Sequence, residues 1–210
     1  MGKIALVFII IVASATYYLT STTYKSSSST NQTAQKRTWI DESGKLHVMG
    51  IILGQSTVRD AEKAFRSRVD AAIFMYPKPD RHGQTQFQLE LEAYFPSIAD
   101  HSKVMLKLAI SQAALEAMRK RSSSPRMYPN GVARRNLASE DILTVQQSTI
   151  RELIIMPSVQ ITPEILAAQF GPEDQKQQDN DGVTHYTYSK IGLVASINEE
   201  GKDKFIFTNP

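Results

Sequence analysis

We predict the fold of this chain from the stretch Met49–Phe65, MGIILGQSTVRDAEKAF, the first of two that we call the deciding stretches. Its first part, Met49–Leu53, is a short apolar run that ends at Gly54, a pattern typical of a buried strand. Thr57 then precedes a helical pattern, and Asp60 follows it within one turn. Because a threonine hydroxyl and a nearby carboxylate satisfy the free N–H groups of a first helical turn, the stretch predicts a strand, a turn and a capped helix.

A second stretch near the C-terminus, Leu153–Phe170, has a similar pattern, LIIMPSVQITPEILAAQF. An apolar run is again followed by a capping threonine, Thr162, and Pro163 occupies the first helical position, where its missing N–H does no harm. The segment Thr162–Phe170 keeps the spacing of Thr57–Phe65. We therefore predict a duplicated strand–helix–sheet unit, and a chance likeness between two strand–helix pairs is the alternative.

Alternating apolar and polar residues around these stretches predict antiparallel strands. Phe87–Ala93 alternates strictly, so one face of that strand should be buried and the other, with Glu90 and Glu92, should be solvated. Further strands are expected over 38–40, 46–53, 71–76, 104–108, 150–156, 183–188, 193–197 and 204–207, with a loop over 77–83 and a further helix over 112–121. The predicted fold class is therefore α+β, with antiparallel sheets and short helices packed on one face.

Residues 1–19 predict an N-terminal hydrophobic helix that holds the chain at a membrane. A basic residue, Lys3, precedes a long apolar run, and Tyr17 and Tyr18 suit a membrane interface. We expect this anchor to lie in the bacterial inner membrane, with the rest of the chain in the periplasm. The alternative is a secretory signal that is cleaved at Ala15, which would release the chain into the periplasm.

Composition divides the remainder of the chain. Residues 20–37 are rich in Ser and Thr, so they predict a flexible tether. We expect a first α+β unit over 38–121, a basic loop over 122–138 and a second α+β unit over 139–210. The 210 residues include no Cys, which excludes disulfides and thiolate metal sites, and a net charge of +3 is too small to indicate nucleic-acid binding.

The segment 119–135, RKRSSSPRMYPNGVARR, is basic and contains no acidic residue. Its Ser, Pro and Gly residues predict a loop. Near a membrane, such a loop would suit anionic lipid headgroups, lipopolysaccharide or an acidic partner, and a merely solvated loop is the alternative. The candidate binding residues are Arg119, Lys120, Arg121, Arg126, Arg134 and Arg135.

Three aromatic residues are further candidates for contact with a protein partner. They are Trp39, Tyr186 and Tyr188. Packing in the core is the alternative role for each of them.

The sequence carries no recognisable catalytic or metal-binding motif. The histidines are His47, His82, His101 and His185, and none has a partner at metal-ligand spacing. A nucleophile elbow, a phosphate-binding loop and a dinucleotide fingerprint are all missing. Asp179 and Asp181 lack the pattern of a calcium loop, so a turn is expected there. We therefore expect no catalytic residue, no metal and no cofactor.

At its two deciding stretches the chain resembles the repeat fold shared by the β-lactamase inhibitory protein and the SmpA/OmlA-type lipoproteins of the outer-membrane assembly machinery. That family has a G-x-[ST] turn, a short helix ending in an aromatic residue or Leu with G-x-P after it, and then an antiparallel sheet. Gly54–Thr57 matches the front of the motif, but Arg66 replaces the Gly after the helix. Phe170–Glu173 is similar to the back, while Val159–Gln160 replaces the front Gly.

The resemblance implies an exported α+β protein, although the lipid-bearing Cys of the assembly lipoproteins is missing. The order of Trp39, a turn and the segment Leu46–Gly54 is also similar to uncharacterised exported proteins of Gram-negative bacteria. That second resemblance implies a compartment and no activity.

Together these features predict a non-enzymatic, membrane-tethered envelope protein that binds a protein partner through the face or edge of its sheet. One alternative is an accessory subunit held in a larger membrane complex by its N-terminal helix. Another is an envelope enzyme that acts on lipid or glycan through residues such as His185 and Glu90.

Overall fold

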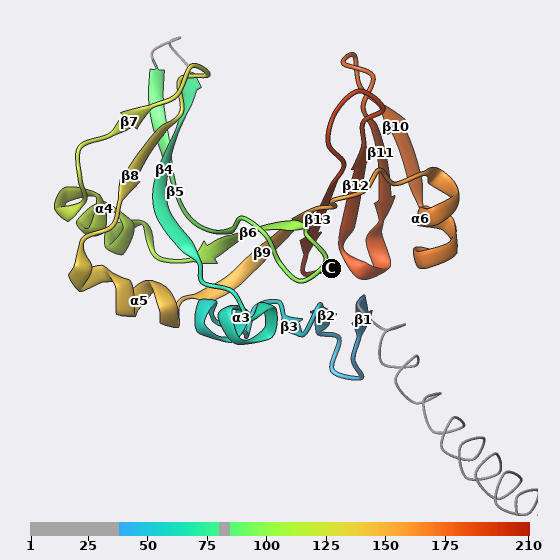
Figure 1. The fold of residues 1–210 in the computed structure, drawn as a ribbon, viewed down its shortest axis with the longest axis horizontal. Helices are drawn as coiled ribbons and strands as arrows, with labels where there is room; N and C mark the ends of the chain where they lie inside the picture. The colour runs from blue at the N-terminus through green and yellow to red at the C-terminus, as the bar shows by residue number, and fades with distance from the viewer. Residues whose placement is uncertain (1–37, 80–84) are drawn as a thin grey trace, which may run out of the picture. The chain divides into compact units, whose positions relative to one another are not determined.

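The computed structural model describes residues 38–79 and 85–210, and Thr38–Pro210 form one compact unit (Figure 1). The predicted anchor, 1–19, and the predicted tether, 20–37, lie outside the described residues. Within the described part, no helix is both long and apolar enough to cross a membrane.

The fold is α+β, with antiparallel sheets and short helices, as predicted. The α-helices are α3 (Val58–Phe65), α4 (Gln112–Arg121), α5 (Ile142–Gln147) and α6 (Pro163–Phe170), and short 3-10 helices cover Ser139–Asp141 and Ser189–Ile191. The strands are β1 (Thr38–Ile40), β2 (Leu46–Val48), β3 (Ile51–Ile52), β4 (Asp70–Pro79), β5 (Thr85–Phe95), β6 (Lys103–Ala109), β7 (Arg126–Met127), β8 (Ala133–Asn136), β9 (Thr149–Met156), β10 (Gln175–Gln178), β11 (Thr184–Tyr188), β12 (Leu193–Ile197) and β13 (Lys204–Thr208).

One large sheet contains most of these strands. It has ten strands in the order β10-β11-β12-β13-β9-β6-β5-β4-β8-β7, and β1-β2-β3 form a separate three-stranded sheet. Strand β9 lies near the middle, between β6 and β13. The large sheet is therefore continuous across both halves of the chain.

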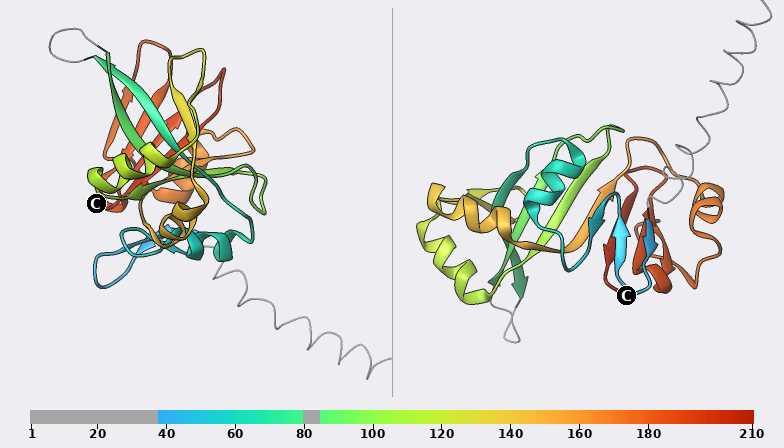
Figure 2. Two further views of the ribbon diagram at one scale, coloured as in Figure 1. Left: turned by 90° about the vertical axis from the view of Figure 1, so that its left-hand side faces the viewer. Right: turned by 90° about the horizontal axis from the view of Figure 1, so that it is seen from below.

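The two faces of the large sheet differ. Side chains of the four α-helices of the described residues pack against one face of the large sheet and form a single hydrophobic core with it; we call this face the helix face. Phe65 of α3 meets Phe95 edge-on at 5.1 Å between ring centroids, and Phe170 of α6 lies 5.5 Å from Tyr188. Figure 2 shows α3, α4 and α5 grouped beside the β4–β9 part of the sheet. We call the opposite face, against which no helix of the described residues packs, the open face.

The first deciding stretch forms a hairpin before its helix, where we had predicted one strand over 46–53. That prediction was wrong because the chain turns at Met49 and Gly50, whose φ angles are +52° and +84°, and β2 pairs back onto β3. The helix itself is confirmed. Thr57 accepts the N–H of Asp60, and the Asp60 carboxylate accepts the N–H of Thr57, so both ends of a capping box are present.

Backbone hydrogen bonds fasten this turn to the large sheet. The N–H of Gly54 donates to the carbonyl of Ile150 at 2.9 Å, and the N–H of Ile150 donates to the carbonyl of Ser56 at 2.9 Å. The segment before α3 therefore continues the pairing at the start of β9. The second deciding stretch is placed differently from the first, since its strand is β9 itself.

Two segments that we predicted as loops belong to the large sheet. Strand β4 continues through Pro77 and Pro79, where a loop was expected from Pro77 onward. Proline is tolerated there because β8 pairs with β4 only over Ala72–Met75, so no described strand pairs with the outer edge of its far end. The predicted basic loop, 122–138, contains the hairpin β7–β8, which extends the sheet beyond β4.

We expect Gly192→Ala to lower the free energy of unfolding by about 3 kcal/mol, because two costs combine. Gly192 has φ +55°, and an added Cβ would lie 1.9 Å from the carbonyl oxygen of Thr208 in β13. Gly182→Ala is the matched control, because Gly182 has φ +79° with open space around it, so only the backbone cost of about 1 kcal/mol applies. Urea unfolding measures both, and equal losses would contradict the close approach of β13.

Candidate functional site

Charged side chains gather on the open face near the centre of the large sheet. Glu92 of β5, Lys107 of β6 and Glu152 of β9 stand in register on neighbouring strands. The ammonium group of Lys107 lies 3.1 Å from a carboxylate oxygen of Glu152. Arg151 forms an ion pair with Glu90, the next residue on this face of β5. We call these five residues the charged cluster.

A β-bulge explains how Arg151 reaches this cluster. The register of β6 with β9 shifts between Lys107 and Leu108, so that Lys107 pairs with Glu152 while Leu108 pairs with Ile150. Arg151 is the extra residue in β9. A bulge redirects side chains that strict alternation would send to opposite faces, and it therefore lets Arg151 and Glu152 join the same cluster.

Glu92 is the buried member of the cluster, with 2% of its surface exposed. The hydroxyl of Tyr76 donates a hydrogen bond of 2.7 Å to its carboxylate. Burial raises the pKa of Glu92 above its ordinary value, and the Tyr76 hydrogen bond and Lys107 oppose that increase. The same burial and hydrogen bond raise the pKa of Tyr76, so its phenol remains a donor at neutral pH. The prediction that Glu92 is solvated was wrong.

A row of apolar side chains crosses the open face next to the cluster. Tyr94 pairs with Met105, Met105 with Ile154, Ile154 with Ile206, and Ile206 with Val194. We call these five residues the apolar row. Ile154 is buried, and the other four are partly exposed. On the open face, the apolar row therefore lies directly beside the charged cluster.

The β7–β8 hairpin borders a cavity of about 570 Å³ at one end of the apolar row. Its lining residues are Asp70, Phe74, Tyr76, Glu92, Tyr94, Met105, Arg126, Tyr128, Asn130, Val132 and Arg134. The ring of Phe74 stacks against that of Tyr76 with 6.3 Å between centroids. Aromatic rings, a buried carboxylate and arginine side chains therefore line one hollow.

The predicted basic residues do not form a free cationic patch, because most of them have partners. Arg119 pairs with Glu116 at 2.7 Å and Arg121 with Glu140 at 2.8 Å. Arg121 also pairs with the buried carboxylate of Asp141.

The remaining cations of that set differ in exposure. Arg134 pairs with Asp70 at 2.7 Å, and Arg135 donates to the carbonyl of Ser123 at 2.8 Å. Arg126 is exposed and lies over the ring of Tyr128. Lys120 is exposed on α4. Of the six, Arg126 and Arg134 line the open-face cavity.

The three predicted aromatic contact residues lie apart from the open-face site. Tyr186 and Tyr188 are 5% and 4% exposed, which places both in the core of the helix face. Burial raises the pKa of Tyr188. Trp39 is 37% exposed and stacks on His47 at 4.0 Å between ring centroids, in the small sheet. Trp39 is therefore the one member of this set with an exposed side chain.

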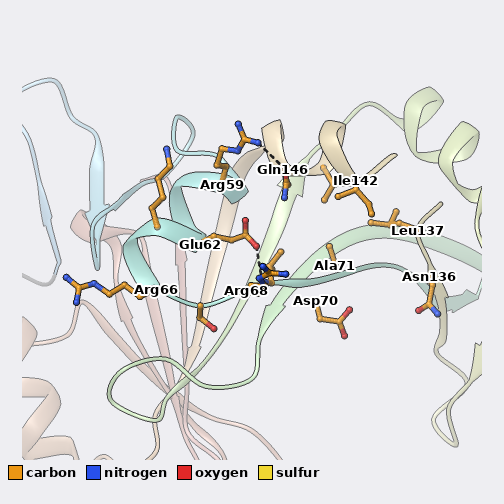
Figure 3. Close-up of a pocket in the computed structure, with 14 residues that line it drawn as sticks. Arg59, Glu62, Arg66, Arg68, Asp70, Ala71, Asn136, Leu137, Ile142 and Gln146 are labelled. Carbon is orange, nitrogen blue, oxygen red and sulfur yellow. Dashed lines mark hydrogen bonds between the residues drawn. The ribbon is translucent and has the colours of Figure 1, made fainter. Parts of the chain in front are cut away.

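A second, larger pocket lies where α3, α5 and the start of β4 meet, and its volume is about 830 Å³ (Figure 3). Its lining residues are Arg59, Glu62, Lys63, Arg66, Ser67, Arg68, Val69, Asp70, Ala71, Asn136, Leu137, Ile142, Val145 and Gln146. We call it the α3–α5 pocket. No sequence pattern indicated it, because its residues come from segments far apart in the chain.

His185 contacts a serine and an aspartate on the surface of the second half. Its Nδ1 lies 2.9 Å from Oγ of Ser196, and its Nε2 lies 3.2 Å from a carboxylate oxygen of Asp179. A hydrolase also needs N–H donors aimed at the reacting carbonyl oxygen. Ser196 lies within β12, which pairs with β11 and β13 on its two sides, so the nearby N–H groups point along the sheet. The two contacts of His185 stabilise the turn after β10. The Asp179 carboxylate stabilises the same turn by accepting the N–H of Val183.

Within residues 38–79 and 85–210, no group of three His, Asp or Glu side chains is placed to hold a metal ion. Comparison of the chain with protein-family models, with curated proteins and with solved structures finds no match to any of them.

Glu92→Gln should remove a pH dependence of stability. Because the folded-state pKa of Glu92 is raised above its ordinary 4.5, wild-type stability is complete below pH 4.5 and falls as the pH rises through the folded-state value. Each whole pKa unit of increase corresponds to about 1.4 kcal/mol. The variant keeps an acceptor for Tyr76, so its free energy of unfolding should gain on the wild type between pH 4.5 and 8.

Lys107→Met is the companion variant. Removal of this ammonium group should raise the pKa of Glu92 further, so that the loss of stability becomes larger and continues to higher pH, since Lys107 favours the ionised carboxylate. Urea unfolding at several pH values measures both effects. A difference between Glu92→Gln and wild type that stays constant from pH 4.5 to 8 would contradict the raised pKa.

Proposed function

We propose that this chain is a non-enzymatic, membrane-tethered protein of the bacterial envelope that binds a protein partner through the open face of its sheet. The observation that supports this most is the apolar row, which lies beside the charged cluster on a face that no described helix covers. Protein interfaces commonly place aromatic and aliphatic side chains at the centre and charged groups around them.

The character of the exposed groups favours a protein over a small metabolite. Tyr94, Met105, Val194 and Ile206 are partly exposed along a line that crosses the sheet from β5 to β12. A partner that covered this line would remove apolar surface from water, which is favourable by about 25 cal/mol per Å². The ion pairs of the charged cluster would then help to define its orientation.

The edge of the sheet offers a second mode of contact. All four residues of β10 are exposed, and on its outer side β10 has no strand partner in the described part of the chain. A partner segment could pair with this edge by strand addition. Lys176 is the single charge on it, and its ammonium group lies over the ring of Tyr186 at 5.2 Å.

The location belongs to the same proposal and rests on the sequence. Residues 1–19 would anchor the chain in the inner membrane and residues 20–37 would hold the folded unit in the periplasm. Cleavage at Ala15, with release into the periplasm, is the alternative. An N-terminal sequence of the native protein distinguishes the two, because only the anchored form keeps Met1.

We also infer that α3 and α6, each with the strands that follow it, are copies of one unit. Both helices begin at a capping threonine, since Thr57 accepts the N–H of Asp60 and Thr162 that of Ile165. Both end in a phenylalanine that packs on the helix face, Phe65 in α3 and Phe170 in α6. Such a duplication would agree with the resemblance to the inhibitory-protein and lipoprotein repeat.

Crosslinking in the native cell tests the binding face. A photoreactive amino acid at Ile206 of the apolar row should give a covalent adduct with one defined protein, whereas the same residue at Ile165 should not. Ile165 is the matched control because it is 44% exposed but lies on α6, away from the open face. An adduct at Ile165 and none at Ile206 would contradict the proposal.

Two rival functions have their own tests. An accessory subunit of a membrane complex would lose its activity when residues 1–19 are replaced by a cleavable signal, whereas a binding module would keep it. An envelope enzyme that acts on lipid or glycan would lose its activity on Ser196→Ala or His185→Ala, since these residues make the hydroxyl–imidazole contact. An unchanged phenotype in both variants, and in Glu90→Ala, would exclude the enzyme.

A further inference from the structure

The α3–α5 pocket joins an apolar floor to a cationic rim. Its floor consists of aliphatic side chains, Val69, Ala71, Leu137, Ile142 and Val145. Val145 is 2% exposed and belongs to the hydrophobic core. Ile142 also lines the pocket, but its side chain is 48% exposed. The pocket therefore keeps accessible apolar surface that the fold itself does not cover.

The rim of the pocket has more cationic than acidic side chains, and the cations are available to bind an anion. Its cations are Arg59, Lys63, Arg66 and Arg68, and its acids are Glu62 and Asp70. Figure 3 shows Arg59 and Arg68 near Glu62, while the side chain of Arg66 extends away from them. Both acids are engaged, since Glu62 accepts the N–H of Val69 at 3.1 Å and Asp70 pairs with Arg134 at 2.7 Å.

The cations of the rim have weaker interactions with neighbouring side chains than the two acids have. Arg59 reaches the side chain of Gln146 only at 3.5 Å, and Lys63 lies 3.8 Å from Asp60. The side chains of Arg66 and Arg68 are exposed and have no hydrogen bond or ion pair to another described residue. An anion at the rim could therefore bind these groups without displacing an existing partner.

We propose that the α3–α5 pocket binds an anionic amphiphile, with one acyl chain on the floor and its carboxylate among the guanidinium groups. A volume of about 830 Å³ lies in the range of small-molecule sites. A carboxylate offers two acceptors that match the fork of an arginine. An acyl chain suits the floor better than a peptide, because the aliphatic floor offers no partner for backbone N–H and C=O groups.

The site does not depend on the proposed partner, because no residue of the apolar row lines it. It lies mainly on the helix side of the sheet, where α3 and α5 pack, and shares only Asp70 with the open-face cavity. Failure of one proposal would therefore leave the other standing. Crosslinking at Ile206 reports on the first and ligand binding at the α3–α5 pocket on the second.

A single fluorescent label can report on this pocket in the full-length chain. The chain contains no Cys, so Gln146→Cys provides a unique attachment point on the rim. With the labelled protein in lipid nanodiscs at pH 8, dodecanoate should give a saturable change in emission. The same label at Lys120→Cys on α4, outside the pocket, should give no saturable change.

Matched variants and ligands test the two parts of the ligand. The double change Arg66→Gln with Arg68→Gln should weaken dodecanoate binding about tenfold or more, as for the loss of a charge-assisted hydrogen bond, whereas Lys120→Gln should have no effect. Ile142→Ser should weaken binding, while Leu143→Ser should not, because Leu143 is 55% exposed on the same helix but does not line the pocket. Thermal unfolding of each variant confirms that it is folded.

Several results would overturn the proposal. Equal affinity for acetate would mean a site for simple anions, and equal affinity for dodecyltrimethylammonium would mean unspecific apolar adsorption. Tighter binding of a short peptide of alternating Leu and Glu than of dodecanoate would assign the pocket to a protein segment. Equal losses in Ile142→Ser and Leu143→Ser would place the acyl chain elsewhere.

Discussion

Strand β9 holds the two halves of the structure together because it is paired on both of its sides. β9 pairs with β6 over Lys103–Ala109 and with β13 over Phe205–Thr208, and it is thus the link between the two halves of the large sheet. The turn before α3 is also fastened to its first residues by backbone hydrogen bonds. Leu153 and Ile155 place its core side on the helix face. A change that loosens β9 would therefore disturb both halves together.

The same strand determines the chemistry of the open face. Its bulge brings Arg151 and Glu152 toward the acids of β5, and its Ile154 supplies the middle of the apolar row. Burial of Glu92 costs free energy that Tyr76 and Lys107 offset only in part, as its raised pKa indicates. Buried charged groups often contribute little to stability, and this agrees with the role in recognition that we propose for the cluster.

Local signals made much of the fold predictable. The cap at Thr57, Pro163 at the first turn of α6, and strict alternation in β5 and β6 are short-range patterns, and each of these elements is present. The break at Met49 and Gly50 could not be foreseen, because positive φ at a methionine depends on the hairpin that forms around it.

The candidate site was less predictable, because it depends on register between distant strands. The alternating pattern of its strand predicts that Glu92 is solvated. Its burial depends on Tyr76 and Lys107, which lie beside it only in the folded structure. Arg151 joins the cluster through a bulge that has no sequence signature here. The ion pairs of the basic segment could not be predicted either, since partners such as Asp70 lie far away in the sequence.

The measurement that tests the open face most directly is oxidative footprinting of the protein in its native cell and after purification. We expect Met105 and Tyr94, both partly exposed on the apolar row, to be oxidised less in the cell than in the purified protein. Ile165 on α6 should be modified equally in both samples. Equal oxidation of Met105 and Tyr94 in the two samples would contradict a partner on this face.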